Sequence, residues 1–146
     1  MIHFEGERTF PLPAAEVFSR LANAEFLVGC VKDVSEIVEK GPDRAVWKQR
    51  PGFSFVRTTL TITMDFIERV ADTLIKVRLH SRGIGASSTV ESAMSFHAVD
   101  GGTQVSWTAD VTELTGLLKL VPKGLISSSA NKVIEETWGE IEARLR

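Results

Sequence analysis

Few residues of this sequence have the types and the spacing that enzyme chemistry requires. The histidines His3, His80 and His97 are far apart and lack the one-turn helical spacing of paired metal ligands, so we expect no metal site. Glu135 and Glu136 are adjacent on a predicted helix, so their side chains point about 100° apart and cannot serve one substrate as acid and base. We interpret these two glutamates as surface charge.

Three further motifs are also better explained by structure than by catalysis. Cys30 is the single cysteine and has no histidine beside it in the sequence, which favours a small buried hydrophobic residue over a nucleophile. Residues 83–88 resemble half of a phosphate-binding loop, but they join two predicted strands and open no helix. The serine run 127–129 is expected to permit a close approach of helix to sheet, with one hydroxyl able to face a ligand. The sequence therefore predicts no catalytic residue, no metal and no cofactor bound through such motifs.

Apolar and sulfur-containing residues form a larger set on one face of the predicted strands and of the last helix. Such residues usually form a packed core, but a long curved sheet that grips a single helix leaves space at its middle. We therefore expect a ligand-sized apolar cavity, where methionine adapts to an irregular ligand and an indole nitrogen orients a carbonyl group. The candidate ligand-binding residues are Leu60, Ile62, Met64, Phe66, Val77, Leu79, Met94, Phe96, Trp107, Ile134 and Trp138.

Hydrophobic periodicity predicts the elements that position this set. Residues 2–10 alternate as a strand, Pro13 begins a short helix, and Asn23 is placed to cap a second short helix over 24–28. From Lys32 onward the period is two, with a bulge expected near 57–59. Breaks rich in glycine, proline and aspartate divide this region into six strands, near 32–39, 44–50, 53–69, 73–82, 87–99 and 103–113.

The connections between these strands are too short for parallel crossovers, so the sheet must be antiparallel. From about Gly116 to Leu145 the period becomes helical, and Pro122 and Gly124 are expected to kink the helix or start it afresh. These elements predict a single α+β domain over residues 1–146. In it, a curved seven-stranded antiparallel sheet wraps around a long C-terminal helix, and two short helices follow the first strand.

Basic residues gather on the outer face of the fifth predicted strand. They are Lys76, Arg78, His80 and Arg82. Their simplest interpretation is a solvated face balanced by Asp65 and Glu91 across the sheet. The alternative is a surface that docks to an enzyme complex or to a membrane, through Lys76, Arg78 and Arg82.

Composition narrows the possible partners. The 146 residues carry a formal net charge of -2, which argues against nucleic acid as a partner. One cysteine permits no intramolecular disulfide, and the sequence has neither a signal-peptide pattern nor an apolar run long enough to span a membrane. We therefore expect a soluble cytoplasmic protein, whose oligomeric state the sequence leaves open.

Several short motifs in this order carry a family resemblance. They are Phe4-Glu5-Gly6 with residues 10–18 (FPLPAAEVF), Gly102-Thr103-Gln104-Val105-Ser106-Trp107, and Leu114-Thr115-Gly116-Leu117-Leu118 with Gly124-Leu125-Ile126. With the element order, they resemble the START-like (SRPBCC) superfamily of polyketide cyclases and lipid-transfer proteins. Within it they are most similar to the CoxG family of carbon monoxide dehydrogenase subunits. The resemblance implies a helix-grip fold with a cavity between the sheet and the C-terminal helix.

The function that this implies is binding of a hydrophobic small molecule, of quinone, lipid or polyketide type, by an accessory protein of a redox enzyme complex. One alternative is an aromatase or cyclase, which would need ionisable groups turned inward, such as Arg57, Asp65 or His97. A second alternative is a protein-interaction module whose core is filled.

Overall fold

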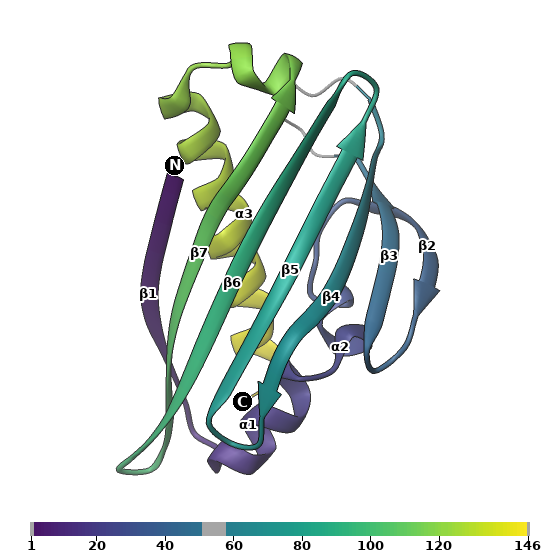
Figure 1. Cartoon of the computed structure of the whole chain (residues 1–146). Helices are drawn as coiled ribbons and strands as arrows, with labels where there is room; N and C mark the ends of the chain where they lie inside the picture. The colour runs from purple at the N-terminus through teal and green to yellow at the C-terminus, as the bar shows by residue number, and fades with distance from the viewer. Residues whose placement is uncertain (1, 51–57, 146) are drawn as a thin grey trace.

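The computed structural model describes residues 2–50 and 58–145, which form one curved sheet packed on a long helix (Figure 1). The sheet is antiparallel and has seven strands in the order β1-β7-β6-β5-β4-β3-β2. Its strands are β1 Ile2–Phe10, β2 Val34–Lys40, β3 Arg44–Gln49, β4 Leu60–Val70, β5 Leu74–Gly83, β6 Ala86–Val99 and β7 Gly102–Gly116. The helices are α1 Ala14–Leu21, α2 Ala24–Val28, the 3-10 helix η1 Leu117–Leu120, and α3 Lys123–Arg144.

This architecture confirms the predicted helix-grip fold, with α3 along one face of the sheet and the two short helices after β1. In Figure 1, η1 and the start of α3 lie at the upper end of the sheet, beside the β5–β6 hairpin, whereas α1 lies at the lower end. Of the predicted strand over 53–69, residues from 58 onward are described, and β4 begins at Leu60. Residues 51–57, and with them Arg57 and part of the expected bulge, lie outside the described residues.

Local sequence signals explain where the helices begin. The Asn23 side chain accepts hydrogen bonds from the backbone N–H groups of Glu25 at 2.9 Å and Phe26 at 3.4 Å, so it caps α2 as predicted. The C-terminal helix begins later than Gly116, because β7 continues to that residue and η1 follows. Pro122 has no N–H to donate and its ring excludes a preceding helical turn, so α3 starts anew after it, as expected.

A hydrophobic core closes the lower end of the sheet. The ring of Phe18 on α1 packs edge-on against Phe96, with centroids 5.5 Å apart. The hydroxyl of Thr103 donates a 2.8 Å hydrogen bond to the carbonyl of Leu12 in the turn before α1. These contacts fix α1 across the ends of β6 and β7, so the rest of the concave face is covered by α3, with α2 and η1 beside it.

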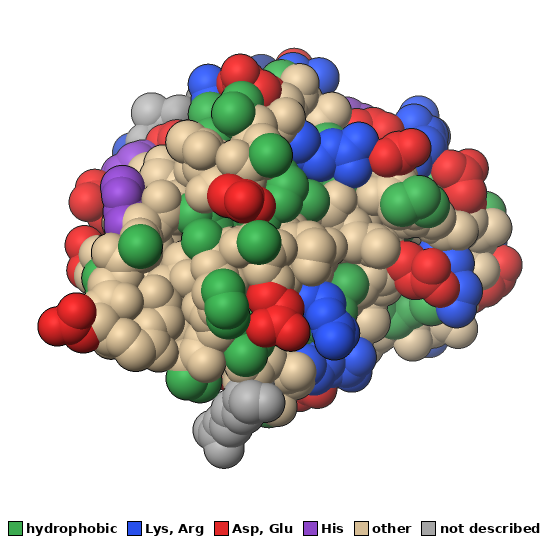
Figure 2. Space-filling model, turned by 90° about the horizontal axis from the view of Figure 1, so that it is seen from below, with side chains coloured by type: hydrophobic (Ala, Val, Ile, Leu, Met, Phe, Trp, Pro, Cys, Tyr) green, Lys and Arg blue, Asp and Glu red, His purple; other side chains and the backbone are tan. Residues whose placement is uncertain are grey.

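The outer surface at the lower end carries both signs of charge. Figure 2 views this end from below, and acidic and basic side chains are interspersed across it. No single-sign field faces the solvent in that view, in keeping with the small net charge of -2.

Candidate functional site

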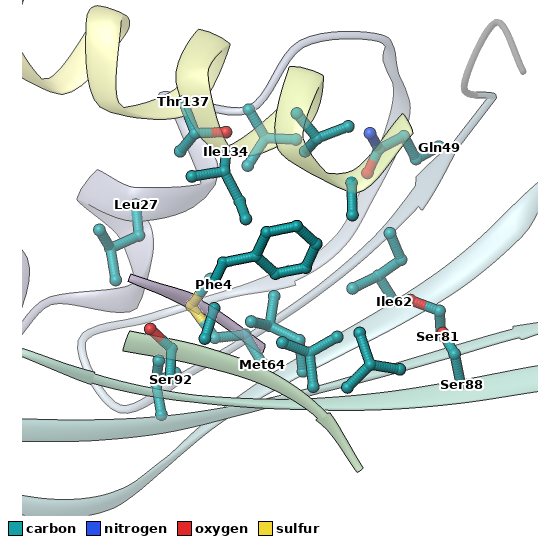
Figure 3. A pocket seen from close by; sticks show the side chains of 18 of the residues that line it. Phe4, Leu27, Gln49, Ile62, Met64, Ser81, Ser88, Ser92, Ile134 and Thr137 are labelled. Carbon is teal, nitrogen blue, oxygen red and sulfur yellow. The ribbon is translucent and has the colours of Figure 1, made fainter. Parts of the chain in front are cut away.

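A cavity of about 350 Å³ lies between the sheet and α3. This volume falls within the usual range of small-molecule sites. Most of the candidate ligand-binding residues line it, namely Leu60, Ile62, Met64, Val77, Leu79, Met94, Trp107, Ile134 and Trp138. Figure 3 shows side chains from the strands and from α3 surrounding the open space.

Strand register places the lining residues at successive levels of the sheet. Ile62 on β4 is opposite Ser81 on β5, and Ser81 is opposite Ser88 on β6, which sets one level near the upper end. Lower down, Met94 on β6 is opposite Trp107 on β7. Each of these residues is at an inward-facing position of its own strand. Their side chains therefore share the concave face and meet α3.

Two of the candidate residues, Phe66 and Phe96, do not line the cavity. Phe96 is covered by Phe18 of α1, as described above. Phe66 lies where β4 is interrupted by a register shift, and the guanidinium of Arg69 stands 4.5 Å from the centre of its ring. Both residues face inward as predicted, but α1 covers Phe96, and Phe66 lies under Arg69 of its own strand.

Sequence reasoning missed most of the polar residues of the wall. These are Gln49, Ser81, Ser88, Ser92 and Thr137, whereas Ser129 lines the cavity as one member of the serine run. For the residues on strands, the sequence did contain a signal of their inward position, because Ser81 follows Val77 and Leu79 in the same alternation. Likewise Ser88 and Ser92 have the parity of Met94. Polar residues at inward positions are the exception, so their parity marked them as candidates.

Aromatic stacking forms the lower wall of the cavity. The rings of Trp107 on β7 and Trp138 on α3 stack with centroids 5.9 Å apart and planes 27° apart. Trp138 also contacts Phe10, at 6.4 Å between centroids. The stack joins the helix to the sheet directly below the open space and contributes aromatic attraction beyond the buried area.

The cavity wall contains no ionisable side chain among the residues that the structure describes. Asp65 is on the outer face, where its carboxylate accepts a 3.0 Å hydrogen bond from Arg44, and His97 is exposed. Cys30 is buried outside the cavity wall, and burial raises the pKa of its thiol, which keeps it protonated and unreactive. An inward acid or base, which the cyclase alternative needs, is therefore absent from the described wall.

Ion pairs tie α3 to the first strand. Arg8 faces inward on β1, and its Nη2 atom is 2.6 Å from Glu135 while its Nη1 atom is 2.9 Å from Glu142. Only 20% of the Arg8 side chain is exposed. Glu135, predicted to be plain surface charge, thus helps to hold the helix, whereas Glu136 forms a more exposed pair with Lys32 at 3.3 Å.

The basic row of β5 lies on the outer face of the sheet, as predicted. Lys76 is 3.7 Å from Glu68, and Arg78 is 3.8 Å from Glu91. Within residues 2–50 and 58–145, Arg82 forms no ion pair. The expected partner Asp65 instead pairs with Arg44, so the row is balanced mainly by Glu68 and Glu91.

The described residues form neither a metal centre nor a membrane-spanning helix. Nowhere in them do three histidine, cysteine or acidic side chains converge as metal ligands would. None of the described helices is long and apolar enough to cross a membrane.

Comparison with protein families and known structures identifies relatives. Residues 6–146 match the family model of CoxG, one of the carbon monoxide dehydrogenase subunits. No curated protein matches the chain in sequence. A conserved protein from Geobacillus kaustophilus has a similar structure, with a TM-score of 0.84 and 15% identity over 99% of this chain and 95% of that one.

Two further structures share the fold at lower similarity. A START superfamily protein from Mycobacterium smegmatis gives a TM-score of 0.68 at 10% identity, covering 98% of this chain and 96% of that one. Ara h 8.0201 gives 0.65 at 17% identity, covering 99% and 97% respectively. At such identities these neighbours establish the START-like fold alone.

Proposed function

The chain belongs to the CoxG family of carbon monoxide dehydrogenase subunits, and from that premise we propose that it binds a hydrophobic small molecule between the sheet and α3. The ligand is of quinone, lipid or polyketide type, and the protein acts as an accessory component of a redox enzyme complex rather than as a catalyst. The observation that carries this proposal is the cavity of about 350 Å³ with a mainly apolar wall.

Burial of apolar surface supplies the driving force, at about 25 cal/mol for each Å² removed from water. Met64 and Met94 adapt to ligand shape, and the Trp107–Trp138 stack offers a flat aromatic wall. A cavity of this size also argues against the filled-core alternative. The cyclase alternative has no support from the described wall, which lacks an acid or base.

Native mass spectrometry of the protein purified from its own cells, followed by organic extraction, tests the proposal. We expect a stoichiometric apolar molecule that extraction releases. An Ala130→Phe variant provides the control, because Ala130 lines the cavity from α3 and the larger ring occupies the ligand volume. A ligand-free mass, together with no thermal stabilisation by a panel of quinones and lipids, would shift the assignment to an interaction module.

For the enzyme complex, we propose docking through the outer row, with Lys76, Arg78 and Arg82 facing an acidic partner surface. Arg82 supports this proposal most, because the described residues offer it no acidic partner. A carbon monoxide dehydrogenase-type complex should be recovered less well on an Arg78→Glu/Arg82→Glu variant than on the wild type. Lys132→Glu, on the exposed side of α3, is the matched charge-reversal control, and equal recovery on both variants contradicts this surface.

A further inference from the structure

Polar side chains line both ends of the cavity, and Ser92 and Thr137 lie on the side of Leu27 (Figure 3). Gln49, Ser81 and Ser88 gather near the upper end with Ile62, and Figure 3 shows them away from Leu27. Ser88 lies about 20 Å along β6 from Met94, at the usual rise of a strand. Met94 is at the level of the tryptophan stack, so Ser88 and the stack lie at opposite ends of the cavity.

Gln49 is a buried amide whose orientation is set by a neighbouring side chain. The residue is 7% exposed, and its Oε1 atom accepts a 3.0 Å hydrogen bond from Nε1 of Trp47. An indole nitrogen can only donate, so the oxygen of the amide must face Trp47. The Nε2 group of Gln49, which has no partner among the described residues, is left as a donor at the cavity wall.

The two serines add hydroxyl groups at the neighbouring level. Ser81 and Ser88 are direct partners across β5 and β6, and both line the cavity. Neither hydroxyl bonds to another group in the part of the chain that the structure describes. By contrast, Ser92 donates a 2.7 Å hydrogen bond to the carbonyl of Thr108. The upper end therefore offers one amide donor and two hydroxyls that each donate and accept.

Charge limits which ligands fit these groups. The described wall carries no lysine, arginine or histidine to compensate an anion, and no carboxylate to compensate a cation. Moving an ionised carboxylate or phosphate from water into such a wall is strongly unfavourable when no opposite charge is present. Neutral carbonyl, ether or hydroxyl groups have no such penalty and can use the amide and the hydroxyls.

We propose that the cavity selects an uncharged amphiphile and binds it in one orientation. Its hydrogen-bonding head lies against Gln49, Ser81 and Ser88, and its apolar body extends toward Trp107 and Trp138. The proposal rests on the proposed ligand-binding function and specifies its ligand class. It separates neutral ligands from fatty acids and phospholipids, which the apolar volume alone would also accept.

All 3 tryptophans of the sequence line the cavity, so intrinsic fluorescence reports its occupancy. We would titrate the full chain, stripped of endogenous ligand, with three probes of equal chain length. These are 1-dodecanol, dodecanoate above its pKa, and dodecane. We expect 1-dodecanol to bind at least about tenfold more tightly than each of the other two, which corresponds to about 1.4 kcal/mol.

Variants assign the selectivity to the polar end. In a Ser81→Ala/Ser88→Ala double variant the preference for 1-dodecanol over dodecane should fall about three- to tenfold, the loss expected for one or two hydrogen bonds. Gln49→Met removes the amide donor with little change in volume and should act in the same direction. Ser95→Ala, on the opposite parity of β6, is the control and should leave the preference unchanged.

The possible results separate the two proposals. Equal binding of dodecanoate and 1-dodecanol would overturn the selection against charge, and equal binding of dodecane would overturn the polar head site. A preference that survives in both variants would also overturn the head site. If none of the three probes binds and no extracted ligand is found, the proposed function itself fails.

Discussion

At the scale of single residues, the cavity depends on a position that has no side chain. Gly6 on β1 is the register partner of Trp107, and a Cβ atom at Gly6 would stand 2.8 Å from the Cζ2 atom of the indole. Real Cβ atoms essentially never approach other atoms so closely, so the indole lies against β1 here because residue 6 is glycine. The placement of Trp107, and with it the lower cavity wall, follows from this contact.

Gly6→Ala should therefore displace Trp107 toward Trp138 and the cavity. We expect a loss of about 1–3 kcal/mol in the free energy of unfolding, typical of overpacking, together with weaker binding of apolar probes. Urea denaturation and the near-ultraviolet circular dichroism of the tryptophans measure the two effects. Thr9→Ala on the exposed face of β1 is the control, and an unchanged tryptophan spectrum in Gly6→Ala would contradict the prediction.

A pH-dependent contact joins the two strands β1 and β7. The ring of His3 bonds to the carboxylate of Asp110 at 2.5 Å and to that of Glu5 at 3.0 Å, and these hydrogen bonds raise the pKa of His3 above 6.5. The protonated ring thus contributes stability that is fully present below the unfolded pKa and is lost as pH rises through the folded pKa.

The stability difference between the wild type and His3→Gln should accordingly be larger at about pH 5.5 than at about pH 8.5. Urea midpoints at both pH values measure it, and the NMR titration of the His3 ring gives the pKa directly. Because His3 is exposed, the effect should shrink in high salt. If the stability difference between the wild type and His3→Gln grew as the pH rises, the prediction would be wrong.

At the scale of elements, α3 is held by aromatic packing at its middle and by ion pairs beside it. Arg8 is its main electrostatic tie, with two carboxylates of the helix within 3 Å of one guanidinium. At the other end, η1 carries large apolar side chains in the solvent, with Leu117 63% and Leu120 80% exposed. The helix is thus firmly fixed in its lower part and loosely covered at its beginning.

Breaking the Arg8 tie should destabilise the protein. Arg8→Met leaves Glu135 and Glu142 without their partner, and we expect a cost of about 1–3 kcal/mol, as for hydrogen bonds between charged groups. A double-mutant cycle with Glu142→Gln, measured by urea denaturation, should give a coupling energy of about 0.5–3 kcal/mol. Lys32→Met, which breaks the exposed pair with Glu136, should cost at most about 1 kcal/mol. Zero coupling would mean that packing alone holds α3.

The beginning of the helix should open more readily than its middle. Gly116 has a φ of +59°, η1 has no buried residue, and Pro122 interrupts the helical hydrogen bonds. We expect backbone amides over 117–121 to exchange with solvent faster than those over 130–140 in hydrogen-exchange mass spectrometry. Slower exchange at η1 would exclude this segment as the route by which a ligand enters.

At the scale of the whole molecule, the sheet and α3 leave space that the side chains do not fill. Native interiors are close-packed, so an open volume of about 350 Å³ costs packing contacts that the folded state would otherwise gain. Such a cost is expected where the open volume serves ligand binding. Stability and binding are therefore opposed in this fold.

Filling the volume should separate the two properties. Ala130→Phe adds a ring to the cavity from α3, so we expect the unfolding temperature to rise or stay unchanged while the binding of apolar ligands is lost. Calorimetry with and without ligand measures both. Asn131→Phe, on the exposed side of the same helix, is the control. Retained binding in Ala130→Phe would mean that the ligand lies elsewhere.

The sequence alone determined the elements and the faces. Alternation at Leu60, Ile62 and Met64 predicted an inward row that the structure confirms, and Pro122 predicted the fresh start of α3. Such features depend on neighbours within a few residues, because the periods of strands and helices are local properties of the backbone. The family motifs are local as well, and for this reason the family could be identified before the structure.

The tertiary structure alone decided which inward residues face the open space. Phe96 and Met94 have the same parity on β6, yet α1 covers Phe96, whereas Met94 lines the cavity. Likewise, no local pattern predicted that Gln49, Ser81 and Ser88, from three strands, would meet at one end of the cavity. Nor did any local pattern predict that Arg8 would contact α3. Periodicity specifies the side of an element on which a residue lies. What covers that side depends on contacts between segments distant in the chain.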